Sequence, residues 1–134
     1  MMPQQNHSKP KQIIGRNEIV DFPELGVLNM QAKIDTGAYS STLHCRDIRV
    51  QGIQLCFKIE NEKEHCFNEF SQKNIKNSFG KIEKRYIIKT KIKIANRVIK
   101  SIISLTNRGT MRFPVLIGRK LLKNKFVVDV SLKK

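Results

Sequence analysis

The sequence predicts a mainly β domain with one short helix. Apolar and polar residues alternate over residues 27–34 and 86–94, and a period of two is typical of a half-buried strand. In the second half of the chain, only residues 118–125 have a plausible helical pattern. The length of 134 residues favours a single domain.

The first half begins with a polar segment. Residues 1–12 contain two prolines and almost no apolar side chains, so we expect a disordered amino-terminal tail before a domain of residues 13–134. Residues 13–20 have β character, and a turn is expected at 23–26. The strand at 27–34 is predicted to bury one set of alternate residues. These are Leu28, Met30, Ala32 and Ile34.

The second half contains the strongest strand pattern, at residues 86–94. Its inward face is predicted to hold Ile88, Thr90, Ile92 and Ile94, and its outward face Lys89, Lys91 and Lys93. A turn at 95–97 leads to a partner strand at 98–106, which predicts an antiparallel hairpin. Residues 115–117 are all apolar and predict a strand covered on both sides, and 126–130 predict a last strand.

The charge is concentrated in the second half. Residues 71–134 carry 18 basic and 2 acidic side chains, whereas residues 1–70 carry 8 and 9. Such a positive field attracts polyanions, although a solvated basic surface would have the same composition.

Cysteine content and hydropathy bear on the compartment. The three cysteines are an odd number, which favours reduced thiols over a disulfide framework. No apolar run approaches the ~20 residues of a membrane helix, so we expect no membrane segment. The amino terminus lacks a secretory pattern, so a cytoplasmic location is expected.

The tripeptide Asp35-Thr36-Gly37, followed by Ala38, comes directly after the strand at 27–34. An Asp at a tight turn can present its carboxylate at the floor of a cleft. Gly37 would permit a close approach, and the Thr36 hydroxyl could hold the turn. An ordinary turn uses the same residues, so the tripeptide alone is a weak signal of catalysis.

A second motif lies 80 residues after Asp35, at Val115-Leu116-Ile117-Gly118-Arg119. The two motifs together, with Ser41, Leu43 and His44 after the first and 126–129 after the second, resemble the retropepsin-like aspartic peptidases. The chain is most similar to a bacterial branch that carries the name ATP-dependent zinc protease and is associated with the RimK-type ribosomal-modification ligase. The resemblance spans nearly all of residues 13–129.

This resemblance implies a closed, acid-protease-type barrel and an aspartic endopeptidase with Asp35 as the catalytic carboxylate and Thr36, Gly37 and Ala38 as loop support. Two adjacent carboxylates share a proton in such enzymes. The chain has one Asp-Thr-Gly, so the second carboxylate would come from another copy in a homodimer. The family's context implies acidic, glutamate-rich tails linked to ribosomal-protein modification as substrate.

Three arginines in or near the motif segments are candidate ligands for substrate carboxylates: Arg108, Arg112 and Arg119. A planar guanidinium can grip a carboxylate with two hydrogen bonds. For Arg119, the alternative is a bracing role beside the core strand.

The resemblance also places a flap, the hairpin that closes over substrate, around residues 60–80, with Glu83 and Arg85 after its turn. A merely structural hairpin is the alternative.

No metal or cofactor is expected. The candidate ligands His44, Cys45, Cys56, His65 and Cys66 lack the spacing of a zinc site, and there is no ATP-binding loop. Two alternatives to an enzyme remain open. One is a non-catalytic binding module of the same fold for an acidic protein or RNA, and the other is an RNA binder that uses the Lys89, Lys91 and Lys93 face.

Overall fold

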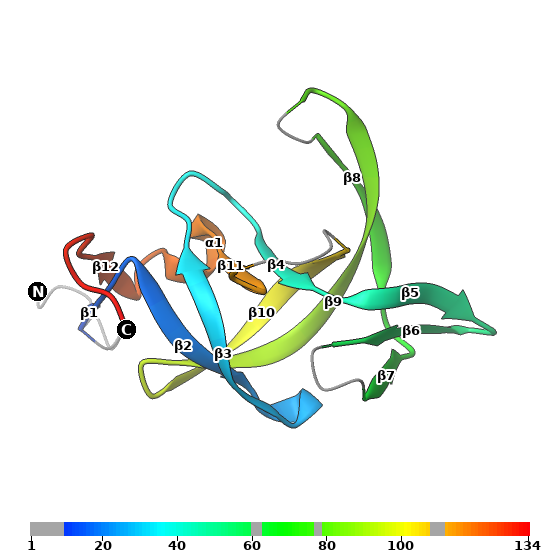
Figure 1. Ribbon diagram of the computed structural model, residues 1–134, viewed down its shortest axis with the longest axis horizontal. Coiled ribbons are helices and arrows are strands. Elements are labelled where there is room, and N and C mark those ends of the chain that lie inside the picture. Colours follow the sequence, from blue (N-terminus) through cyan, green and yellow to red (C-terminus); the bar gives the residue numbers. More distant parts are fainter. Residues whose placement is uncertain (1–9, 60–62, 77–78, 108–111) are drawn as a thin grey trace, which may run out of the picture.

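A ring of six strands forms the body of the protein in the computed structural model, which describes residues 10–59, 63–76, 79–107 and 112–134. The strands follow the order β10-β4-β11-β3-β2-β9, and pairing of β9 with β10 closes the ring (Figure 1). Their bounds are β2 Asn17–Phe22, β3 Val27–Ile34, β4 Ser41–His44, β9 Ile82–Ile94, β10 Arg97–Thr106 and β11 Val115–Ile117. The predicted mainly β fold with a closed barrel is confirmed.

The β9–β10 hairpin matches its prediction in both faces and partner. The four predicted inward residues of β9 are buried, and the three lysines predicted to face outward are exposed. Ala95 and Asn96 make the turn, both with positive φ (50° and 65°), as a two-residue hairpin turn requires.

Strand β3 has the predicted bounds but one wrong face assignment. Met30, Ala32 and Ile34 are buried, whereas Leu28 is 64% exposed. Asn29 has φ 60°, and the pairing of β2 with β3 shifts register near this point. The irregularity breaks the alternation, so Val27 is buried in place of Leu28.

The first and last strands pair with each other. Strand β1 (Gln12–Ile14) pairs in parallel with β12 (Phe126–Val128). Helix α1 spans Arg119–Leu122, shorter than predicted, and Asn124 with φ 65° follows it. A 3-10 turn, η1, occupies Pro23–Leu25. Within the described residues, none of the helices has the length and apolar character to cross a membrane.

The remaining strands lie outside the ring. Strands β5 (Arg46–Gln51), β6 (Gln54–Lys58) and β7 (Glu64–Phe67) form a separate three-stranded sheet. Strand β8 (Ser71–Lys76) pairs with the first half of β9, and this hairpin projects from the barrel (Figure 1). A hairpin therefore lies where the flap was expected, and its role as a flap stays a prediction.

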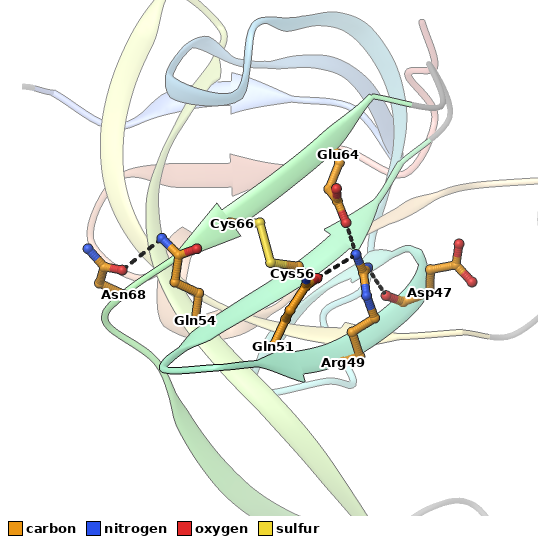
Figure 2. The surroundings of a disulfide bond; sticks show 8 residues. All are labelled: Asp47, Arg49, Gln51, Gln54, Cys56, Glu64, Cys66 and Asn68. Atoms are coloured by element: carbon orange, nitrogen blue, oxygen red, sulfur yellow. Dashed lines mark hydrogen bonds and ion pairs between the residues drawn. A yellow bond between two sulfur atoms is a disulfide. The ribbon is translucent and has the colours of Figure 1, made fainter.

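The small sheet carries a disulfide between Cys56 and Cys66 (Figure 2). The two residues are direct partners on the antiparallel strands β6 and β7, with a Cα–Cα distance of 4.1 Å. The prediction of reduced thiols is therefore wrong for this pair, because pairing across strands brings together cysteines ten residues apart. Cys45 is free in the core, and burial raises the pKa of its thiol to about 12.

Candidate active site

Strand β11 positions the Asp35 loop. It lies between β3 and β4, parallel to the first and antiparallel to the second. The loop 35–40 joins β3 to β4, so it passes around the end of β11. The Asp35 N–H donates to the carbonyl of Ile117, the last residue of β11, at 2.8 Å.

One hydrogen bond within the loop holds the Asp35 carboxylate, and another holds its backbone carbonyl. The Gly37 N–H donates to Asp35 Oδ1 at 3.1 Å, and the Ala38 N–H donates to the Asp35 carbonyl at 3.1 Å. The side chain is half-buried. Among the described residues nothing donates to Oδ2, so one oxygen is anchored and the other is available for chemistry.

The close approach in this site belongs to Gly118 and not to Gly37. A Cβ at Gly118 would lie 2.5 Å from the Ser40 carbonyl oxygen and 2.7 Å from that of Tyr39, whereas one at Gly37 would meet only Asp35 Oδ1, at 3.4 Å. The steric reason predicted for Gly37 is therefore wrong. The buried hydroxyl of Ser41 also accepts a hydrogen bond from the Gly118 N–H at 3.1 Å.

Arg119 braces the loop from the far side. Its Nη1 donates to the Thr36 carbonyl at 3.1 Å, and its guanidinium carbon lies 5.8 Å from the centre of the Tyr39 ring. Its backbone N–H donates to the Ala38 carbonyl at 2.8 Å. These contacts match the bracing alternative for Arg119, and its predicted role in substrate binding stays untested.

The other two arginines have different positions. Arg112 is exposed, with its guanidinium carbon 5.5 Å from the centre of the Phe113 ring. Arg108 lies outside the described residues. Arg112 also lines a groove of about 250 Å³, which contains Lys33 and Ile34, the two residues before Asp35. The full lining is Arg16, Asn17, Lys33, Ile34, Arg112, Phe113 and Lys133.

This groove has four cationic side chains and no carboxylate in its lining. Sequence reasoning missed three of them: Arg16, Lys33 and Lys133. They come from both ends of the chain and from β3, and two backbone hydrogen bonds bring them together. The Arg16 N–H donates to the Leu132 carbonyl at 2.7 Å, and the Ile34 N–H donates to the Arg16 carbonyl at 2.9 Å. No local pattern could reveal such a cluster.

The comparison with known families decides what kind of protein this is. Residues 13–134 match the family described as "RimB-like: Retropepsin-like aspartic endopeptidase RimB". The chain belongs to this family. The RimB-like assignment confirms the predicted retropepsin-like class and the predicted family.

Relatives of this RimB-like chain include longer proteins. Two, from Shewanella halifaxensis and Shewanella pealeana, are 36% and 35% identical over 92% of the chain and are each called "Probable alpha-L-glutamate ligase". The chain spans about 30% of the length of each of these proteins. A solved Legionella pneumophila structure of unknown function (DUF785) is 27% identical, with a TM-score of 0.72, and the match covers 91% of this chain and 95% of that one.

The zinc in the name ATP-dependent zinc protease, which the resemblance carried, can be tested against the structure. Among the described residues, one group brings three candidate ligand atoms within 4.8 Å of one another, from Cys56, Glu64 and Cys66. Both sulfur atoms are joined in the disulfide (Figure 2), and zinc binds thiolates. Cys45 donates its thiol hydrogen to the Leu43 carbonyl in the core. These residues do not fit a zinc site in this state.

Proposed function

We propose that the domain is an aspartic endopeptidase that hydrolyses peptide bonds in acidic, glutamate-rich chains. The observation that carries the proposal is the Asp35 carboxylate, with Oδ1 anchored by the Gly37 N–H and the loop held between β11 and Arg119. A fixed carboxylate at a half-buried loop is what a general acid–base group needs, because its position is set before substrate arrives.

The chemistry requires a second carboxylate. In this proposal it is Asp35 of a second copy, placed across a two-fold axis. Two carboxylates at hydrogen-bonding distance hold one proton between them. The ionised group takes a proton from water as that water attacks the peptide carbonyl, and the protonated group donates to the carbonyl oxygen. As the tetrahedral intermediate collapses, the carboxyl that took the proton from water gives it to the leaving amine, the C–N bond breaks, and the other carboxylate takes back the proton of the former carbonyl oxygen.

The groove beside Asp35 supports an acidic substrate. Arg16, Lys33, Arg112 and Lys133 line it without a carboxylate among the lining residues, so it offers complementary charge to glutamate side chains. The names of the relatives, probable α-L-glutamate ligases, and the link of the family to ribosomal-protein modification support the same substrate class. A ligase of that name and a peptidase would make and break bonds between the same residues.

The deciding experiment compares the wild-type protein with Asp35→Asn on a glutamate-rich peptide, with products identified by mass spectrometry. We expect hydrolysis by the wild type and none by the variant, with melting temperatures within a few degrees. Asp47→Asn, at an exposed position of β5, is the matched control and should keep full activity. Hydrolysis by Asp35→Asn at the wild-type rate would refute the mechanism. Binding of the peptide by the wild type without turnover would favour the alternative, a non-catalytic binding module.

A further inference from the structure

The outward face of the β9–β10 hairpin carries four exposed lysines, Lys89, Lys91, Lys93 and Lys100, which we call the lysine face. None of the four forms an ion pair with any residue in the described part of the chain. This face belongs to strands other than those that join the Asp35 loop, β3 and β4 (Figure 1). The proposed peptidase chemistry does not use it.

The arrangement of these lysines opposes folding. Lys91 and Lys100 are direct cross-strand partners, and Lys89 and Lys93 occupy the same side of β9 two residues before and after Lys91. Like charges in directly opposite positions destabilise a sheet. The stability of the fold therefore does not explain why these lysines lie together. An anionic partner would offset the repulsion between them.

Three carboxylates lie near the face, but within the described residues none of them forms an ion pair with its lysines: Asp21, Glu24 and Glu69, which lines a cavity together with Lys89. Asp21 pairs with Lys93 across β2 and β9, but its Oδ1 accepts a hydrogen bond from the Asn29 N–H at 2.9 Å. Glu24 Oε1 accepts from the Lys91 N–H at 2.9 Å and from the Thr90 hydroxyl at 3.3 Å. These hydrogen bonds come from neutral groups and do not remove the charge of a carboxylate, so the acids offset part of the positive charge. The four lysines still outnumber the three acids, and the face remains cationic.

The surroundings of the face extend its charge and add apolar area. Val98 and Ile102, 56% and 40% exposed, alternate with Lys100 along β10. Next to Lys100 is a cavity of about 140 Å³ that Lys120 and Lys125 also line, again with no carboxylate in the lining. The other lining residues are Ser41, Ile99, Ser101, Ile102 and Leu121. The mixture of cations and exposed aliphatic side chains fits a polypeptide better than a nucleic acid backbone.

The spacing of the lysines identifies the form of the partner. Alternate residues of a strand repeat every ~6.8 Å on one face, since each residue rises ~3.4 Å. An extended peptide has the same repeat, so its alternate carboxylates would meet Lys89, Lys91 and Lys93 in register. We propose that the lysine face is a docking track for an acidic peptide in extended conformation. That this peptide is also the substrate rests on the proposed function. The docking itself does not.

The test measures binding in the Asp35→Asn background, so that no peptide is cleaved and the outcome is independent of hydrolysis. One variant changes Lys89, Lys91 and Lys93 to Gln. The matched control changes Lys11, Lys58 and Lys123 to Gln, which removes the same charge from three lysines outside the lysine face, the groove beside Asp35 and the hairpin expected to act as a flap. Two peptides of equal charge and length serve as probes, one with Glu at every second position and one with Glu in adjacent pairs separated by pairs of Ser.

We expect the alternating peptide to bind more tightly than the paired one at low salt. The lysine-face variant should weaken binding of the alternating peptide about tenfold, consistent with three exposed ion pairs, and abolish the preference between the peptides. The control should change affinity less than twofold. Equal loss in both triple variants, or equal binding of both peptides, would overturn the proposal. Tighter binding of an equally charged single-stranded RNA, lost only in the lysine-face variant, would identify the face as an RNA site instead.

Discussion

Gly118 sets how closely the Asp35 loop approaches the start of α1. A methyl group there would overlap the Ser40 and Tyr39 carbonyl oxygens at 2.5 and 2.7 Å. We predict that Gly118→Ala lowers the free energy of unfolding by about 1–3 kcal/mol, the usual range for overpacking, as measured by urea denaturation. Gly37→Ala, whose added methyl has room, should cost far less. A stable Gly118→Ala protein would show that the loop can move away at little cost.

Arg119 follows Gly118 in the sequence and also contacts the backbone of the Asp35 loop. Its guanidinium donates to the Thr36 carbonyl and lies over the Tyr39 ring, so its loss should loosen the loop without removing a contact to substrate. We predict that Arg119→Gln lowers kcat about tenfold on acidic and neutral peptides alike, with KM nearly unchanged. A rise in KM confined to the acidic peptide would instead make Arg119 a ligand for substrate carboxylates.

The disulfide adds to the packing of Leu55 and Phe57 that holds the three-stranded sheet against the core. The disulfide closes a loop between residues ten apart. Closing this loop removes conformational entropy from the unfolded chain and so raises its free energy by about 2–3 kcal/mol. We predict that a dithiol reductant lowers the melting temperature of the wild type by several degrees. The double variant Cys56→Ser, Cys66→Ser should show the lower value from the start and no response to reductant. An unchanged melting temperature on reduction would mean that the sheet is held by packing alone.

Strands β9, β5 and β4 show where sequence patterns can and cannot predict an element. Residues 86–94 of β9 could be predicted because buried and exposed residues alternate regularly from Ile88 to Ile94, whereas the earlier part of the strand lacks this alternation. Strand β5 has no buried residue among its six, and β4 has only four residues, three of them buried. Neither has a periodicity that can be distinguished from a loop. The disulfide was missed for a related reason, because cross-strand register is not visible in spacing along the chain.

The whole-molecule prediction concerns the number of copies in the active unit. If each site uses Asp35 from two chains, a mixed dimer of wild type and Asp35→Asn has an incomplete dyad. Equal mixing after subunit exchange should then reduce activity per total protein to about one quarter of the wild-type value. A simple dilution to about one half would show that each chain works alone. Sedimentation of the same samples supplies the control for dimer formation.

Part of the candidate site could be predicted from the sequence. The Asp35 loop is local in sequence, and the resemblance added the second motif with Gly118 and Arg119. The cationic groove was not predictable, since Arg16, Lys33, Arg112 and Lys133 are spread over most of the chain. Only the folded backbone brings them together, so composition could indicate an excess of charge but not where it gathers.

The position of β11 also determines when the Asp35 loop can form during synthesis of the chain. The loop of residues 35–40 is held by a strand that is synthesised about 80 residues later, at 5–20 residues per second or roughly 4–16 s. Until β11 emerges and inserts between β3 and β4, Asp35 lacks the Ile117 carbonyl, and Thr36 lacks the Arg119 side chain. A growing chain therefore contains residues 35–40 well before the hydrogen bonds that hold this loop can form. The order in which the strands are made therefore delays completion of the Asp35 loop until most of the chain has been synthesised.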